Sequence, residues 1–234
     1  MKFLFNVGAE KSGTTWLYYY FQKHPEFYDI GKELNVIQRD DLVPTFVDSW
    51  NYKKDIEKYF CDISKINQVT GDFTHYEGST ENVFRLFKNG LAKYDIDVVP
   101  VYIMRDPIKR AWSSWNMLGG GTNFNMPDPA FFITQNFFQC KYKETIESLD
   151  NVFPKPLYFF YEDFFKQENI DTICDELEIE KIPAQFSNII NKGSYDNNIP
   201  QEFIEKFCLT TKNKNAVRFI LERFDNVPWD LTNY

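Results

Sequence analysis

The segment GAEKSGTTW, residues 8–16, joins a short apolar run to a stretch of helical length. Residues 2–7 read as a buried strand, and residues 14–23 contain no helix breaker before Pro25. A loop that leads from a strand into a helix exposes backbone N–H groups, and the helix dipole favours an anion there. Together with two glycines, Lys11 and three hydroxyl side chains, this arrangement predicts a phosphate-binding loop.

The order of residues in this loop differs from a Walker A loop. In the Walker pattern GxxxxGK[ST] the lysine follows the second glycine, whereas Lys11 precedes Gly13. The Gly, Ser and Thr residues, taken alone, would also fit an ordinary strand–turn–helix connection with a surface lysine. The order KSGTTW after an initial strand favours the phosphate-binding interpretation.

Further apolar runs alternate with segments of helical pattern. Strands are expected at residues 68–72, 98–104 and 157–161, and Pro100 places the first half of its strand toward a sheet edge. Helices are expected at residues 79–94, 107–118, 131–149, 169–178 and 200–224, the first of them capped by Ser79 or Thr80. The pattern predicts an α/β fold, residues 1–234 forming a single domain with a mainly parallel central sheet flanked by helices.

Composition narrows the class of function. The chain has 34 acidic and 26 basic residues, a net charge of −8, and 18% aromatic residues. The aromatic content argues against disorder, and the acidity argues against nucleic-acid binding. Residues 144–180 hold 11 of the acids and only 2 lysines, so a small anionic ligand can still bind elsewhere.

Cysteine usage and hydropathy say less about function. The four cysteines form no CxxC pair and there are two histidines, so no metal is expected. The chain shows neither a signal peptide nor a transmembrane segment, which predicts a cytoplasmic protein. The oligomeric state cannot be read from the sequence.

Four motifs together resemble the sulfotransferases that use 3′-phosphoadenosine 5′-phosphosulfate (PAPS). GAEKSGTTWLYYYFQKHPEF, residues 8–27, is similar to their 5′-phosphosulfate motif, and VYIMRDPIKRAWSSW, residues 101–115, is similar to their 3′-phosphate motif. YFFYEDF at residues 158–164 and NKG at residues 191–193 resemble later motifs. The resemblance implies the P-loop-like sulfotransferase fold, with adenosine 3′,5′-bisphosphate (PAP) as the nucleotide product.

The resemblance also implies roles for individual residues. Lys11 would stabilise charge at the bridging oxygen, and the segment Ser12, Gly13, Thr14 and Thr15 would hold the 5′-phosphate. The remaining donor contacts implied are adenine stacking by Trp16 and 3′-phosphate binding by Arg105, Ser113, Lys192 and Gly193. For Trp16, a place in the core is an alternative, and for Lys192 and Gly193 a solvent-exposed turn.

Two residues are candidates for the general base that takes the acceptor proton. Glu33 matches a Lys-Glu motif of glycan sulfotransferases, although Val36 and Ile37 stand where that family usually has aromatics. His75 is the alternative, since histidine is the base in cytosolic members and titrates near neutral pH. Glu33 is slightly preferred.

The sequence thus predicts a PAPS-dependent sulfotransferase with a hydroxyl, less often an amine, as acceptor. A P-loop small-molecule kinase and a non-catalytic nucleotide-binding protein of the same fold are the alternatives. The acceptor is a small molecule, a carbohydrate or a lipid, and residues 119–129 and 131–138 are expected to border its pocket.

Overall fold

A four-stranded sheet forms the centre of the computed structural model, which describes residues 1–32, 49–117, 140–187 and 198–230. All neighbouring strands are parallel and follow the order β2-β1-β3-β4. The strands are β1 (Lys2–Gly8), β2 (Thr70–Asp72), β3 (Asp97–Met104) and β4 (Leu157–Phe160). The predicted parallel sheet is therefore confirmed.

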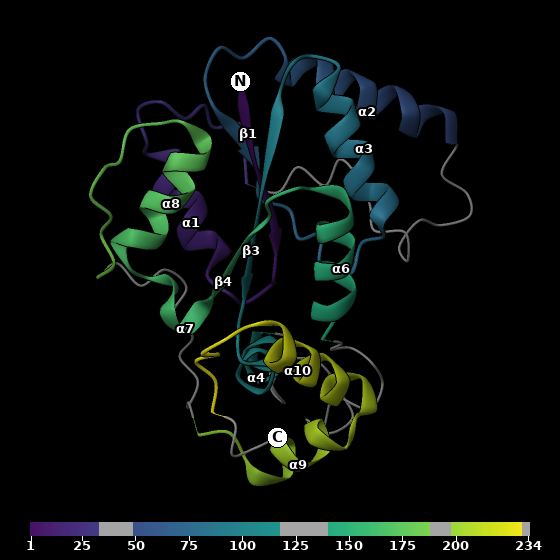
Figure 1. The fold of residues 1–234 in the computed structure, drawn as a ribbon, viewed down its shortest axis with the longest axis vertical. Coiled ribbons are helices and arrows are strands. Elements are labelled where there is room, and N and C mark those ends of the chain that lie inside the picture. The colour runs from purple at the N-terminus through teal and green to yellow at the C-terminus, as the bar shows by residue number, and fades with distance from the viewer. Residues whose placement is uncertain (33–48, 118–139, 188–197, 231–234) are drawn as a thin grey trace.

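Helices cover both faces of the sheet. α1 (Thr14–Gln22) and α8 (Gln167–Leu177) lie on one face, and α3 (Glu81–Ala92) and α6 (Tyr142–Val152) lie on the other (Figure 1). β1 shows why two layers form, because its side chains alternate between the faces. Phe3 and Phe5 pack into the core on the α3 side, whereas Leu4 packs into the core on the α1 side.

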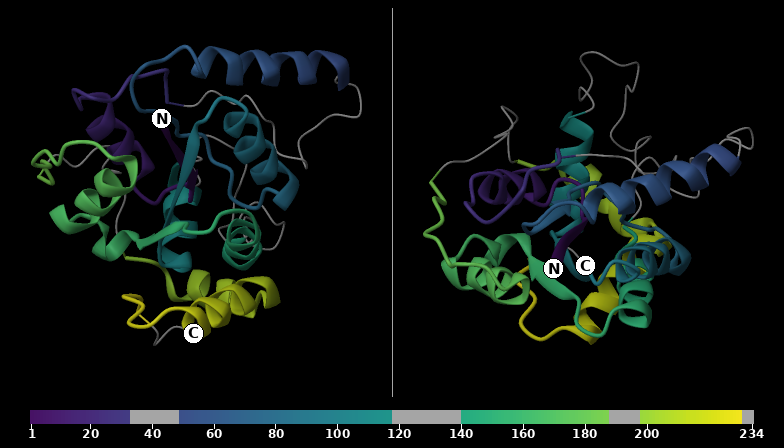
Figure 2. Two further views of the ribbon diagram at one scale, coloured as in Figure 1. Left: turned by 45° about the horizontal axis from the view of Figure 1, so that its top comes forward. Right: turned by 90° about the horizontal axis from the view of Figure 1, so that it is seen from above.

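The remaining helices extend this arrangement. α2 (Ser49–Ile63) packs against α3, and α4 (Pro107–Met117) follows β3 directly. The short α7 (Tyr161–Phe164) follows β4. α9 (Gln201–Leu209) and α10 (Thr211–Arg223) lie near α4, beyond the carboxyl ends of the strands (Figures 1 and 2).

The structure differs from the sequence-based expectation at α2, at α9 and α10, and at the N-cap of α3. α2 was not predicted, although Ile56, Phe60 and Ile63 are buried at helical spacing. The single helix expected at residues 200–224 is two helices, because Thr210 adopts an extended conformation between them. Thr80 occupies the N-cap position of α3, but its side chain makes no capping hydrogen bond.

Pro100 lies where the sequence suggested, at a sheet edge. β3 pairs with β1 along most of its length, whereas β4 begins only opposite Val101. Within the described part of the chain, residues 97–100 therefore have a strand neighbour on one side only. A proline is tolerated there because an edge position does not need its missing N–H group.

No helix in the described ranges is long and apolar enough to cross a membrane.

Candidate active site

The loop between β1 and α1 adopts a conformation that depends on its glycines. Gly8 and Gly13 have positive φ angles of 126° and 82°, and Lys11 has one of 65°. A Cβ atom on Gly13 would lie 3.0 Å from the ring of Phe165 and 3.3 Å from that of Tyr161. Both the backbone conformation and the close approach of these rings therefore favour glycine at position 13.

The loop is fixed through main-chain atoms of three successive residues. The N–H of Ala9 donates to the carbonyl of Ile103 at 2.8 Å. Arg110 Nε donates to the carbonyl of Glu10 at 2.8 Å, and Arg105 Nη1 donates to that of Lys11 at 2.9 Å. Because arginines occupy these two carbonyl oxygens, the oxygens do not repel an anion bound by the loop.

Arg105 lies at the carboxyl end of β3, where open α/β sheets bind ligands. Its guanidinium lies 4.5 Å from the ring centroid of Tyr161. The Tyr142 hydroxyl accepts a hydrogen bond from the Arg105 N–H at 3.1 Å and donates to its carbonyl at 2.6 Å. Both the backbone and the side chain of Arg105 are thus held in place.

Within the described residues, the side chains of Ser12 and Arg105 each contain a buried polar atom without a hydrogen-bond partner. The side chain of Ser12 is fully buried, and its Oγ has no hydrogen-bond partner within the described residues. The same holds for Nε of Arg105. Buried donors of this kind are rare in folded proteins unless something satisfies them. Phosphate oxygens would do so, and the residues therefore fit an anionic nucleotide.

Lys11 is held weakly. Its Nζ donates to the thioether sulfur of Met117 at 3.3 Å. A thioether is a weak acceptor, so the ammonium group can turn toward an anion at little cost.

His75 lies beside the start of the loop. The N–H of Tyr76 donates to the carbonyl of Val7 at 2.9 Å, which joins this segment to the end of β1. Nδ1 of His75 lies 3.8 Å from the position that a Cβ on Gly8 would take. The fold therefore brings His75, one of the two candidate bases, next to the phosphate-binding loop.

Trp16 and Ser113 are both buried. The ring of Trp16 is nearly parallel to those of Tyr20 and Phe186, at centroid distances of 5.9 and 5.2 Å. Its surroundings match the core alternative, and adenine stacking stays a prediction that requires one of these rings to move. Ser113 lies on α4, two turns after Arg105.

Arg110 and Glu77, to which the sequence analysis assigned no role, form an ion pair next to the loop. Arg110 Nη1 donates to Glu77 Oε1 at 2.6 Å, Nη2 contacts Oε2, and both side chains are 5% exposed. Tyr102 also donates to Glu77 Oε1, at 3.2 Å. Local pattern could not reveal the pair, because its members lie 33 residues apart.

Two other carboxyl groups lie near the strand ends, Asp72 fully buried and Glu162 half-buried. Burial raises the pKa of Asp72, although hydrogen bonds from Thr74 and Tyr76 oppose the shift. Burial also raises the pKa of Glu162, which accepts a hydrogen bond from the N–H of Asp106 at 3.0 Å. Both groups support the backbone around the site.

Several predicted site residues lie outside the described residues. They are Glu33, Lys192, Gly193 and the two segments expected to border the acceptor, residues 119–129 and 131–138. Their roles stay predictions. Among the described residues, no group of three or more His, Cys, Asp or Glu side chains could hold a metal ion.

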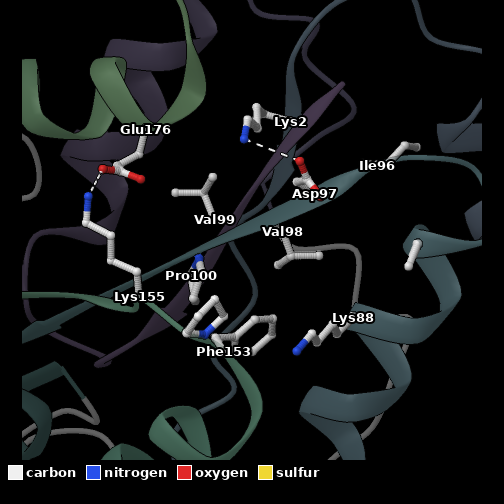
Figure 3. Close-up of a pocket in the computed structure, with 12 residues that line it drawn as sticks. Lys2, Lys88, Ile96, Asp97, Val98, Val99, Pro100, Phe153, Lys155 and Glu176 are labelled. Atoms are coloured by element: carbon white, nitrogen blue, oxygen red, sulfur yellow. Dashed lines mark hydrogen bonds and ion pairs between the residues drawn. The ribbon is translucent and has the colours of Figure 1, made fainter.

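A hollow of about 300 Å³ lies at the opposite, amino-terminal end of the strands (Figure 3). Lys2 forms ion pairs with Asp97 and Glu178, and Lys155 pairs with Glu176. The third lysine of the lining, Lys88, donates to the carbonyl of Val152 at 2.6 Å.

Comparisons with known proteins agree with this geometry. A family model described as a sulfotransferase domain matches residues 3–215. The crystal structure of a sulfotransferase from Alicyclobacillus acidocaldarius is similar at 15% identity and a TM-score of 0.66, covering 95% of this chain and 96% of the other. A mouse sulfotransferase, SULT7A1, solved in complex with PAP, is similar at 16% identity and a TM-score of 0.51, covering 97% and 85%. A comparison with curated protein sequences gives no match.

Proposed function

The chain belongs to the sulfotransferase family, and on this premise we propose that it moves a sulfuryl group from PAPS to a hydroxyl, less often an amine, of its acceptor. The observation that carries the proposal is the pair of buried, unsatisfied donors at the loop, Ser12 Oγ and Arg105 Nε. They lie at the carboxyl ends of two adjacent strands, where a bisphosphorylated nucleotide would supply oxygens for both.

The donor supplies the reaction with an activated sulfuryl group and an anionic leaving group. The first N–H groups of α1 have no partner inside the helix and, with the hydroxyl of Ser12, would bind the 5′-phosphate. Arg105 would bind the 3′-phosphate, with Ser113 as a second donor from α4. The mouse protein complexed with PAP supports this choice of nucleotide.

Lys11 would act on the reacting atoms. Its weak contact with Met117 leaves the ammonium group available to move toward the bridging oxygen as negative charge develops there. A fixed cation at that point lowers the barrier only if its interaction is stronger in the transition state than in the ground state.

His75 would take the proton from the acceptor. Its position beside Gly8 supports this role, and an imidazole changes charge near neutral pH. Glu33 stays the other candidate. A small molecule, a carbohydrate or a lipid could each present the hydroxyl group.

Two substitutions test the donor site. We expect Lys11→Ala to lower the transfer rate to below about 1% of the wild-type rate, because removal of one group that stabilises charge in the transition state costs on the order of 10²–10³ in kcat. We expect Arg105→Ala to weaken PAP binding at least about tenfold, as loss of a charge-assisted hydrogen bond predicts. Transfer is measured with labelled PAPS and an acceptor panel, and PAP binding by calorimetry.

Lys109→Ala is the matched control, since Lys109 lies exposed on α4 close to Arg105. It should leave PAP affinity unchanged. The donor-site assignment is wrong if Arg105→Ala binds PAP as tightly as the wild type. Magnesium-dependent binding of ATP without binding of PAP would instead favour the kinase alternative.

A further inference from the structure

Arg110 is placed to connect the segments of the candidate site. Its Nε donates to the carbonyl of Glu10 in the phosphate-binding loop at 2.8 Å. Its other two nitrogens bind the Glu77 carboxylate, which lies two residues after His75. One guanidinium group therefore joins the donor loop to the segment that carries the candidate base.

A second set of contacts leads from the same side chain to Arg105. The guanidinium of Arg110 lies 5.3 Å from the ring centroid of Tyr142. The hydroxyl of that tyrosine holds both main-chain polar groups of Arg105. The side chain of Arg110 is thus in contact with a support of the proposed 3′-phosphate-binding residue as well.

Because both side chains are buried, each charge of the ion pair depends on its partner. Arg110 is 4% exposed and Glu77 is 5% exposed. A buried charge is tolerated when its partner satisfies it with good geometry, and removal of one partner leaves the other uncompensated. In other proteins, uncharged groups can often replace a buried ion pair without loss of stability. A contribution to stability therefore does not by itself explain why this ion pair is present.

We propose that Arg110, oriented by Glu77, is a positioning residue that holds the phosphate-binding loop in its donor-binding conformation. Arg110 would hold the loop through its hydrogen bond to the Glu10 carbonyl, without contacting the donor or the acceptor. This inference rests on the proposed function. It adds to it a residue pair that acts through the loop rather than on the reacting atoms.

The test uses a double variant that removes both charges while retaining side-chain volume. In Glu77→Gln/Arg110→Met, glutamine keeps an acceptor oxygen for Tyr102, whereas the bond to the Glu10 carbonyl is lost. We expect the Kd for PAP to rise at least about tenfold, because a charge-assisted hydrogen bond that orders the loop is gone. The KM for the acceptor at saturating donor should change less than about twofold.

The control is a second Arg–Glu pair of this chain. Glu81→Gln/Arg85→Met removes an exposed pair on α3 and should leave the Kd for PAP unchanged. Arg110→Lys is the second test variant. It keeps the buried charge, but a single ammonium nitrogen does not reproduce the three guanidinium nitrogens that reach the Glu77 carboxylate and the Glu10 carbonyl together. We therefore expect it to fold and to bind PAP at least about fivefold more weakly.

The outcomes separate the two proposals. A folded double variant, or a folded Arg110→Lys, that binds PAP within twofold of the wild type would overturn the positioning role and leave the proposed function intact. If the wild-type protein bound no PAP, the proposed function and this inference would both fail. Lower thermal stability with unchanged PAP affinity would mark the pair as structural only and would also overturn the inference.

Discussion

Asp72 is a carboxyl group buried at the carboxyl end of β2, one strand away from the phosphate-binding loop. It accepts hydrogen bonds from the N–H of Thr74 at 2.8 Å and from the hydroxyl of Tyr76 at 2.9 Å. These contacts order the segment that leads to His75. Burial nevertheless raises its pKa, because the charged form loses more hydration than the hydrogen bonds return.

The raised pKa predicts a pH-dependent effect of Asp72→Asn. Because the folded-state pKa lies above the unfolded value, the carboxyl group favours the folded state most below its unfolded pKa. That contribution is lost as pH rises through the folded-state pKa. The free energy of unfolding of Asp72→Asn, relative to wild type, should therefore rise as pH rises from the unfolded-state pKa of aspartate, about 3.9, through the raised folded-state pKa.

Urea denaturation at several pH values measures this difference. Asp95→Asn serves as the control, because Asp95 is exposed and its positive φ angle of 56° suits asparagine. Its curve should run parallel to that of the wild type. A relative loss of stability of Asp72→Asn as pH rises would show that the charged carboxylate stabilises the folded state, contrary to the prediction.

At the level of elements, the segment after α10 holds β4, α6 and α7 together. Trp229 is 5% exposed, and its Nε1 donates to Glu162 Oε2 at 3.2 Å. The other oxygen of Glu162 accepts from the N–H of Asp106, at the start of α4. The Trp229 ring packs on Tyr142 and Phe160, with centroids 5.9 and 5.4 Å away.

Two substitutions of Trp229 measure separately how much its ring packing and its hydrogen bond contribute to stability. Trp229→Phe keeps an aromatic ring but loses the bond to Glu162, and should cost about 1.5–3 kcal/mol of the free energy of unfolding. Trp229→Ala also leaves a cavity and should cost about 3–5 kcal/mol. Urea denaturation measures both values. Equal stability of Trp229→Phe and wild type would mean that the bond to Glu162 contributes nothing.

The elements show which features a sequence can predict. The strands and the loop around Lys11 are local patterns, since apolar runs and turn residues are read within a few positions. The position of Arg105 could be predicted for the same reason, because this residue directly follows the apolar pattern of a strand. The division of residues 200–224 at Thr210 was not, because no glycine or proline marks it. The Arg110–Glu77 pair depends on tertiary packing, which no local window contains.

For the whole molecule, the net charge of −8 does not oppose a nucleotide site. Much of the acidity lies in residues 144–180, where exposed carboxylates such as Asp163, Asp175 and Glu178 pair with lysines. Such surface pairs contribute little to stability. The cations proposed to bind the donor, Lys11 and Arg105, lie instead at the carboxyl-terminal side of β1 and β3.

Nucleotide binding should therefore stabilise the whole fold, because the site joins the loop, β3 and α4. A ligand that binds only the folded state at 100 times its Kd stabilises it by about 2.7 kcal/mol. For a chain of this length each kcal/mol moves Tm by about 2–4 °C, so saturating PAP should raise Tm by roughly 5–11 °C. The rise should shrink with added salt, since the contacts are ionic, and at the same PAP concentration it should fall by about half or more in Arg105→Ala, whose Kd is expected to be at least about tenfold higher. Differential scanning fluorimetry with PAP, AMP and Mg-ATP measures these shifts. A rise with AMP as large as that with PAP would show that the 3′-phosphate is not bound, and would remove Arg105 from its assigned place in the site.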